Sequence, residues 1–483
     1  MIIYRSASGD IIKMKNTDCY IFRLRRKRLY GYLVCLSVII VICLNCVTAI
    51  SCSSPIDQKS NPPINDSINK PITGTPIIDG TFIPFYLVPD WDDSRWELEL
   101  ANLKKLGMHY LILSPTVFTD KNNATHTIYP SKNGTPYYPN KDVVESCLRN
   151  ASKFGFKVFV GLNSNEKWWS WWTTDSEGWL YTQMEFGNRI AEELVGKYKS
   201  RYPETMYGWY WDWEVDNLNY TTNSLQQTLI NALNLNIDYL NNLTPGMPII
   251  FSPFMNYRVG DNAYNYGKMW EKIFAGVHFR RGDIFSPQDC IGAGGLTFEN
   301  ASEWFSQLAE AVKAKPGLLF WSNAENFDQR FWTSATLDRF TKQLQVVKPY
   351  VSNYISFTYS YYYSPYKVNK YFDEAYSYYV VNGHLPQLSN PDPVENLILR
   401  TTDSNKISIS WNPPSDKSNL VGFQVFRNGT LIANYQYSID YSCQTTYTEN
   451  ENLSAGSYQY SVCSYNSING CSSERSVQYT KKP

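Results

Sequence analysis

Histidine is scarce in this sequence. The chain of 483 residues contains four histidines, His109, His126, His278 and His384, which lie far apart and form no paired motif. A metal-dependent hydrolase needs clustered histidine and carboxylate ligands. We therefore expect no metal centre and no cofactor.

Cysteines in metal-ligand spacing are also lacking. Five of the ten cysteines lie within residues 1–52, and the others are Cys147, Cys290, Cys443, Cys463 and Cys471. An odd number leaves at least one cysteine unpaired. Cys463 and Cys471 flank a turn-like Asn-Ser-Ile-Asn-Gly segment, so a disulfide between them would bridge two strands.

Runs of basic residues are missing beyond the N-terminus. The whole chain has 44 basic and 44 acidic side chains, but residues 1–51 hold eight of the basic and two of the acidic ones. The remainder has 36 basic and 42 acidic residues, a net charge of about −6. A mildly acidic surface argues against a nucleic-acid partner.

The N-terminus has the layout of a secretory signal. A basic cluster, Arg23 to Arg28, is followed by an apolar run from Tyr30 to Ile50 and then by Ser51-Cys52. A cysteine after a small residue resembles a lipobox, which implies lipidation of Cys52 and a membrane anchor. The alternative is an uncleaved membrane-spanning anchor, since about 20 apolar residues also cross a bilayer. Both interpretations predict an extracytoplasmic protein, and the lipid-anchored one favours the outer membrane or cell surface of a bacterium.

Composition divides the rest of the chain into a tether, two domains and a linker. Residues 52–79 are rich in Ser, Pro, Asn and Asp and predict a flexible tether. A proline-rich linker at 385–391 separates a large domain, 80–384, from a smaller one, 392–483. We expect the smaller domain to fold independently and to be dispensable for chemistry.

The smaller domain has an all-β pattern. Lys406 to Trp411, Gly422 to Phe426 and Ser457 to Val462 alternate apolar and polar residues, as strands with one buried face do. Trp411 before Pro413-Pro414, and Leu453 to Tyr458 before a strand, resemble a fibronectin type III sandwich. The resemblance implies that the tryptophan lies in the core and that the tyrosine makes a corner hydrogen bond. A spacer role is the default for such a domain.

The large domain alternates short apolar runs with amphipathic helical ones. Eight such repeats in about 300 residues predict a (β/α)8 TIM barrel. The alternative, a doubly wound open sheet, is disfavoured because no glycine-rich phosphate turn is present. The eight predicted strands are Thr81–Val88, Tyr110–Leu113, Lys157–Val160, Met206–Glu214, Pro248–Phe251, Asp283–Phe285, Leu318–Trp321 and Asn353–Phe357.

Carboxylates, amides and aromatic rings follow the predicted strands. The C-terminal ends of barrel strands carry function, and a sugar needs hydrogen-bonding groups for its hydroxyls and flat apolar rings for its C–H faces. Aromatic residues make up 16% of the chain, which supports an oligosaccharide or polysaccharide partner. The Trp168 to Trp172 cluster could form a wall of the same cleft. The candidate substrate-binding residues are Trp91, Asn163, Trp211, Trp213, Asp216, Gln288, Asp289, Trp321, Asn323 and Tyr359.

Glu214 and Glu325 are the candidate catalytic pair. They end the fourth and seventh predicted strands, where clan A of the glycoside hydrolases carries its acid/base and its nucleophile. Trp213 departs from that clan, whose acid/base follows an asparagine. More of the chain, residues 80–384, resembles the domain-of-unknown-function family 4434, a glycoside-hydrolase-like barrel family. The motifs that carry this resemblance are Thr81-Phe-Ile, Trp96 to Gly107, Gly208-Trp-Tyr, Trp213-Glu214-Val-Asp216-Asn217, Pro287-Gln288-Asp289 and Glu325-Asn326-Phe327.

Three functional classes fit these features. The first is a retaining glycoside hydrolase, monomeric, with Glu214 as acid/base and Glu325 as nucleophile, facing each other across the barrel mouth about 5–6 Å apart. Asn323 and Ser322 are expected to keep Glu325 ionised. The second is a non-catalytic saccharide-binding lipoprotein that uses the same rim, and the third is a scaffold or adhesion protein.

Overall fold

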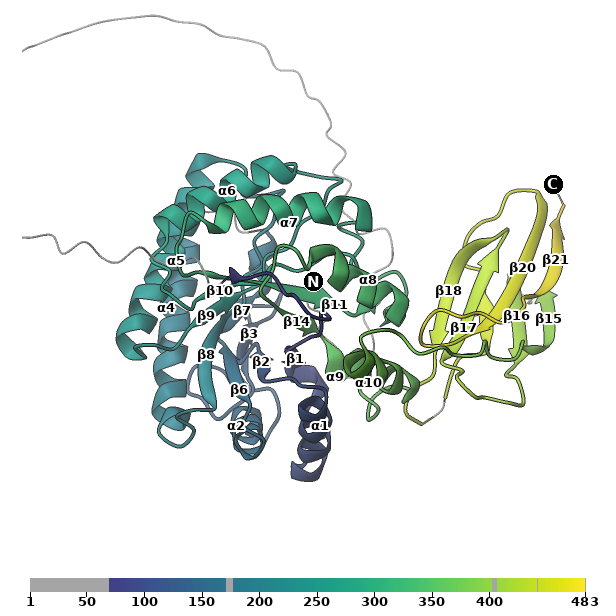
Figure 1. Ribbon diagram of the computed structural model, residues 1–483, viewed down its shortest axis with the longest axis horizontal. Helices are drawn as coiled ribbons and strands as arrows, with labels where there is room; N and C mark the ends of the chain where they lie inside the picture. The colour runs from purple at the N-terminus through teal and green to yellow at the C-terminus, as the bar shows by residue number, and fades with distance from the viewer. Residues whose placement is uncertain (1–68, 171–176, 402–405, 441, 483) are drawn as a thin grey trace, which may run out of the picture. The chain divides into compact units, whose positions relative to one another are not determined.

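A closed barrel of eight parallel strands occupies residues 80–357 (Figure 1). The computed structural model describes residues 69–170, 177–401, 406–440 and 442–482, so the predicted signal, Cys52, most of the tether, Trp171 and Trp172 lie outside it. Around the barrel the strand order is β1-β14-β11-β10-β9-β8-β6-β2, and every neighbouring pair is parallel. The TIM-barrel prediction is confirmed.

Each predicted strand overlaps one barrel strand. Three differ in extent by several residues: β1 ends at Pro84 instead of Val88, β8 ends at Trp211 instead of continuing to Glu214, and β11 continues to Glu325 instead of ending at Trp321. In sequence order the strands are β1 (Gly80–Pro84), β2 (Tyr110–Ser114), β6 (Lys157–Gly161), β8 (Met206–Trp211), β9 (Ile249–Phe251), β10 (Ile284–Phe285), β11 (Leu319–Glu325) and β14 (Asn353–Phe357).

Helices cover the outside of the barrel (Figure 1). Their apolar faces pack against the strands; α2, for example, buries Val144, Cys147, Leu148 and Ala151 and is capped by Asp142, whose side chain accepts from the Glu145 amide. The helices are α1 (Asp93–Lys105), α2 (Val143–Lys153), α4 (Glu177–Leu194), α5 (Asn223–Leu243), α6 (Ala263–Gly276), α7 (Phe298–Val312), α8 (Leu337–Val347), α9 (Tyr359–Tyr362) and α10 (Tyr371–Asn382). None of the helices in the described residues is both long and apolar enough to span a membrane.

The inside of the barrel is a packed core. One buried cluster takes a side chain from every barrel strand: Phe82, Ile112, Phe159, Tyr210, Ile250, Ile284, Trp321 and Ile355. Side chains alternate between the faces of a strand. Ser114, two residues after Ile112, and Asp212, two after Tyr210, therefore continue the inward series, as do Asn323 and Glu325 beyond Trp321. Polar groups thus replace apolar ones toward the C-terminal end of the barrel.

Short strands and single helical turns lie in the connections. β12 (Phe327–Asp328) and β13 (Thr333–Ser334) form an antiparallel hairpin directly after β11. A second small sheet joins β5 (Thr135–Pro136), β4 (Thr125–Thr127), β3 (Val117–Thr119) and β7 (Asn163–Asn165). The remaining short elements are the 3-10 turns Phe85–Leu87 and Glu166–Trp169 and the π-helical turn Val195–Lys199.

The C-terminal region consists of two antiparallel sheets, as the all-β pattern predicted. Trp411 is buried in its core and the Tyr458 hydroxyl donates to the Ser454 carbonyl at 3.0 Å, as the fibronectin type III resemblance implies. One sheet contains β15 (Glu395–Thr401), β16 (Ile407–Asn412) and β19 (Thr446–Thr448). The other contains β18 (Thr430–Gln436), β17 (Gly422–Arg427), β20 (Gly456–Tyr465) and β21 (Arg475–Lys481).

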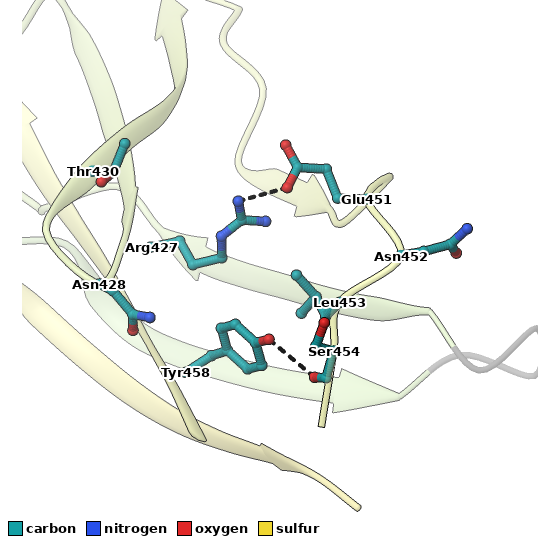
Figure 2. A pocket seen from close by; sticks show the side chains of 8 residues that line it. All are labelled: Arg427, Asn428, Thr430, Glu451, Asn452, Leu453, Ser454 and Tyr458. Atoms are coloured by element: carbon teal, nitrogen blue, oxygen red, sulfur yellow. Dashed lines mark hydrogen bonds and ion pairs between the residues drawn. The ribbon is translucent and has the colours of Figure 1, made fainter. Parts of the chain in front are cut away.

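A polar hollow of about 420 Å³ lies among the loops of this region (Figure 2). The Arg427 guanidinium crosses it and pairs with Glu449 at 2.7 Å and Glu451 at 2.6 Å. Tyr458, the one aromatic residue of its lining, is bonded to Ser454. These lining groups are therefore bonded to each other and connect the segments around the hollow.

Hydrogen bonds connect β18 to the hairpin that follows β11. Gln436 accepts from the Ser334 amide at 2.8 Å and donates to the Ser334 hydroxyl at 2.7 Å, and Asn434 donates to the Thr333 hydroxyl at 3.0 Å. The Leu337 amide, at the start of α8, donates to the Ser467 carbonyl at 2.8 Å. The C-terminal region therefore contacts the hairpin and the start of α8. A spacer role alone would not require these contacts.

Candidate active site

Glu325 is buried at the C-terminal end of β11. Its Oε2 atom accepts a hydrogen bond from the Ala293 amide at 2.6 Å, whereas its Oε1 atom has no protein partner. Burial, and then the negative charge of Asp289, raise the pKa of Glu325 to about 8. This direction is opposite to the expectation that Ser322 and Asn323 would keep Glu325 ionised. Ser322 lies on the outward face of β11, and neither side chain forms a hydrogen bond to the carboxyl.

Asp289 lies behind Glu325 and is completely buried. Its carboxylate accepts from the Ile291 amide at 3.2 Å, from the Gln343 side chain at 2.7 Å and, at 3.4 Å, from the Glu325 amide. Burial raises the pKa of Asp289 to about 6. Asp289 therefore holds the backbone of Glu325, and its carboxylate accepts hydrogen bonds from protein groups.

Helix α8 supplies the second support of Glu325. Gln343 donates one hydrogen bond to Asp289 and another, at 2.9 Å, to the Glu325 carbonyl. The Arg339 guanidinium donates to the carbonyls of Glu325 at 3.3 Å and Phe327 at 2.5 Å. The peptide that carries Glu325 is thus fixed from the outside of the barrel, leaving its side chain on the inward face.

Glu214 follows β8 and is tied to the same segment that supports Glu325. The Gln288 side chain donates to Glu214 Oε1 at 3.1 Å and to the Ser252 carbonyl at 3.2 Å. The Glu214 carbonyl accepts from the Trp168 indole at 2.8 Å. Gln288 contacts Glu214, and its neighbour in sequence, Asp289, contacts Glu325. This segment therefore connects the two candidate catalytic residues.

The same segment turns sharply after Asp289. Cys290 has a φ of 56°, in the left-handed region that non-glycine residues rarely adopt. Its thiol is buried, accepts from the Met255 amide at 3.3 Å and donates to the Gln288 carbonyl at 3.3 Å. These contacts hold the unusual backbone conformation and fix the positions of Gln288 and Asp289. Strained backbone of this kind is concentrated at functional sites.

Asp212 is a third inward-facing carboxyl that the sequence interpretation missed. It lies two residues before Glu214, is 5% exposed and accepts a hydrogen bond from the Ser114 hydroxyl; its Oδ2 atom has no partner. A Cβ on Gly161 would lie 3.0 Å from that oxygen, so a side chain at this position would crowd the carboxyl. Burial raises the pKa of Asp212 to about 7, and the charge of Glu214 adds to the shift. Alternation with period two along Trp211-Asp212-Trp213-Glu214 could have identified it.

Three predicted substrate-binding residues lie on the outward face, toward the helices. The Trp211 indole donates to Asn236 of α5 at 3.1 Å, and Asn163 donates to the Gln183 carbonyl of α4 at 3.2 Å. Trp213 is buried and its ring lies 5.3 Å from that of Trp168. These side chains connect the barrel to its helices and are not part of the rim.

Asp216 and Tyr359 also have structural partners. Asp216 accepts from the amides of Leu218 at 2.8 Å and Asn219 at 2.7 Å, so it caps its own loop. It does not share a strand face with Glu214, because β8 has already ended. The Tyr359 hydroxyl is completely buried and donates to Asp373 of α10.

The two remaining tryptophans are placed differently. Trp321 belongs to the barrel core, 5.2 Å from the ring of Tyr110, the first residue of β2, and therefore lies deep inside the barrel. Trp91 is half-buried after β1, with the Arg95 guanidinium 4.0 Å above its ring and Trp96 against its edge. Of the five aromatic residues in the predicted substrate-binding set, Trp91 alone is partly exposed; Trp169, from the predicted Trp168 to Trp172 cluster, is 41% exposed.

Asn323, one of the predicted polar residues, has a side-chain oxygen without a hydrogen-bond partner inside the barrel. It faces inward on β11, is 2% exposed, and its Oδ1 atom has no hydrogen-bond donor. The backbones of Asn323 and Gln288 form a parallel β-bridge, which joins Asn323 to the segment that contacts both glutamates. In the ranges that the structure describes, no group of three or more His, Cys, Asp or Glu side chains could hold a metal ion.

Comparison with known proteins agrees with this architecture. The family model described as "Domain of unknown function (DUF4434)" matches residues 78–369. No curated protein shows a significant match to the sequence. A solved structure of a "putative alpha-L-fucosidase" from Bacteroides thetaiotaomicron VPI-5482 is similar over 67% of this chain and 99% of its own, with 20% identity and a TM-score of 0.52.

Two further barrels are more distant. The endo-beta-1,4-mannanase from Thermotoga petrophila matches 84% of this chain and 98% of its own at 11% identity and a TM-score of 0.42. The intracellular xylanase TsXylA from Thermoanaerobacterium saccharolyticum JW/SL-YS485 matches 62% of this chain and 90% of its own at 12% identity and a TM-score of 0.37. The fold of the large domain is that of a glycoside-hydrolase-like barrel.

Proposed function

The chain belongs to the DUF4434 family, and we propose that it is a retaining glycoside hydrolase that acts on an extracytoplasmic glycan. The observation that carries this proposal is the linkage of Glu214 and Glu325 through Gln288 and Asp289, at the ends of the fourth and seventh barrel strands. Retaining hydrolysis requires two carboxyl groups about 5–5.5 Å apart, and we predict that separation here.

In this proposal the two glutamates have complementary roles. The Glu325 carboxylate attacks the anomeric carbon while Glu214 transfers its proton to the departing glycosidic oxygen, and the C–O bond breaks. Water then attacks the glycosyl–enzyme ester, Glu214 takes up its proton, and Glu325 is released. The amide of Ala293 holds Glu325 Oε2, which leaves Oε1 as the attacking atom.

The raised pKa of Glu325 imposes one condition on this mechanism. Below about pH 8 the ligand-free carboxyl holds a proton, which must leave before nucleophilic attack. The transition state of glycoside hydrolysis carries positive charge on the sugar ring, and positive charge nearby favours an ionised carboxylate. Substrate binding is therefore expected to bring the pKa of Glu325 down.

The same observation favours one alternative, a non-catalytic saccharide-binding lipoprotein. A neutral Glu325 cannot act as a nucleophile, but its hydroxyl can donate a hydrogen bond to a sugar oxygen. The two functions differ in turnover. A mature chain that binds a glycan but releases no reducing ends over a day of incubation, with and without the Glu325→Gln substitution, would establish the binding function.

We also propose that the mature chain is anchored outside the cytoplasm by a lipid on Cys52. The support is the sequence alone: a basic cluster, an apolar run and a small residue before Cys52. The tether after Cys52 would let the barrel reach a polymeric glycan at some distance from the membrane.

The proposed function is tested by release of reducing ends from a glycan panel. The panel contains fucosylated, mannose-based, xylose-based and glucuronic-acid-containing substrates, and the mature chain is compared with its Glu214→Gln and Glu325→Gln variants. We expect one class to be hydrolysed and both variants to lose turnover, roughly 10²–10⁴-fold for Glu214→Gln. Turnover that persists in both variants would exclude this pair as the catalytic residues.

A further inference from the structure

Trp332 is an exposed aromatic residue on the hairpin that follows Glu325. Its side chain is 37% exposed, whereas large aromatic rings in this barrel are mostly buried. The ring stacks on Phe327 with centroids 5.8 Å apart and an angle of 16° between the planes. One face of the indole is therefore supported by a second ring.

The backbone of Trp332 adopts a conformation that a bulky residue rarely has. Its φ is 55°, in the left-handed region, and its amide donates to the Asp328 carbonyl at 2.7 Å. A glycine or asparagine would adopt this φ at lower cost. Strained positions of this kind are concentrated at ligand-binding sites, so the conformation needs a reason other than local stability.

The hairpin that carries Trp332 begins two residues after the proposed catalytic glutamate. Phe327, two residues after Glu325, lies 6.2 Å from the ring of Phe357, whose own ring is 5.3 Å from Phe82 inside the barrel. A Cβ added to Gly292 would lie 2.8 Å from Glu325 Cβ and 2.5 Å from the Phe327 carbonyl. One loop therefore touches both Glu325 and the ring support of Trp332.

The C-terminal region fixes the base of this hairpin. Ser334, which pairs with Phe327 across the hairpin, donates its amide to Gln436 and accepts from it at its hydroxyl, and the adjacent Thr333 hydroxyl accepts from Asn434. Ser334 and Thr333 are 2% and 7% exposed. The position of Trp332 thus depends on residues more than a hundred positions away, in the other domain.

We infer that Trp332, supported by Phe327 and held through Gln436, is a stacking platform for a sugar ring of the glycan substrate. The inference rests on the proposed function for the identity of the ligand but not on catalysis. An exposed indole offers a flat apolar face that matches the C–H face of a pyranose, and the carboxyl of Glu325 provides the neighbouring polar contact. Gln436 is a positioning residue that acts through the hairpin.

The test measures glycan binding by the mature chain, made inactive with Glu325→Gln, using soluble β-mannan, xylan, a fucosylated oligosaccharide and glucuronoxylan as probes. Binding is measured by isothermal titration calorimetry. Adding Trp332→Ala should weaken binding about tenfold, equivalent to about 1.4 kcal/mol, whereas Trp332→Phe should retain most of the affinity. Tyr239→Ala is the matched control, because Tyr239 is 36% exposed near the C-terminal end of α5, away from the barrel mouth.

Gln436→Ala tests the support separately. It should speed amide hydrogen exchange at Ser334 and weaken glycan binding about threefold, and Gln459→Ala, at an exposed position of β20, should do neither. Unchanged affinity in Trp332→Ala, or no binding of any probe, would overturn the platform. Binding that depends on Trp332, together with a wild-type chain that hydrolyses none of the bound glycans, would refute the proposed catalysis and leave the platform intact.

Discussion

Glu325→Gln should stabilise the protein at alkaline pH while abolishing turnover. Burial and Asp289 raise the pKa of Glu325 from an ordinary value of 4.5 to about 8. Between these values the folded chain holds a proton that the unfolded chain has released. The stability contributed by this group is therefore present below about pH 4.5 and declines as the pH rises toward 8. Glutamine stays neutral, so the variant avoids this decline.

The size of the effect follows from the shift. One pKa unit corresponds to about 1.36 kcal/mol, so a shift of this extent amounts to a few kcal/mol when the carboxyl is fully ionised. This free energy needs no reduction for solvent screening, because Glu325 is only 1% exposed. For a domain of this size the unfolding midpoint should rise by several degrees at pH 8.5 and change little at pH 4.5.

The assay is thermal unfolding, by calorimetry, of the wild type and the variant from pH 4.5 to 9. Glu303→Gln is the control, because Glu303 is exposed on α7 and its substitution should change the midpoint little at any pH. A Glu325→Gln midpoint below that of the wild type at pH 8.5 would refute the reasoning. It would mean that the ionised carboxylate is the stable form in the folded protein.

Three further predictions concern roles, packing and anchoring. With azide, Glu325→Ala should give a glycosyl azide of inverted configuration and Glu214→Ala one of retained configuration, as identified by NMR; exchanged products would reverse the two roles. Ser114→Ala leaves the buried Asp212 without its hydroxyl donor and should cost about 1–3 kcal/mol of unfolding free energy in urea; an unchanged midpoint would show that the bond contributes nothing. Cys52→Ser should abolish incorporation of labelled fatty acid and release the protein from membranes, and a variant that stays in the membrane would favour an uncleaved anchor.

The sequence predicted the barrel well because each strand is a short apolar run with its own turn signals. All eight strands were located, since burial on both faces makes parallel strands hydrophobic along their length. The residues at which the strands end were predicted less accurately. Asp216 appeared to share a face with Glu214, but β8 stops at Trp211, and Asp216 instead caps a loop.

The aromatic residues of the site were harder to predict. Tryptophan and tyrosine serve equally as core, as helix contacts and as sugar platforms, and composition does not distinguish these uses. Trp211 points to the helices because it has outward parity, Tyr359 because β14 ends at Phe357 and Tyr359 begins α9, and Trp321 lies too deep in the barrel. Trp332 was overlooked because its exposure and positive φ arise from a hairpin that no local pattern reveals.

The stereochemistry of the first product tests the central claim most directly. Proton NMR during the first minutes of hydrolysis, on a substrate of known anomeric configuration, shows the anomer released before mutarotation. We predict the same anomeric configuration as in the substrate, because a double displacement through Glu325 inverts it twice. Release of the opposite anomer would contradict it and would imply carboxyl groups about 6.5–9.5 Å apart, with water as the nucleophile.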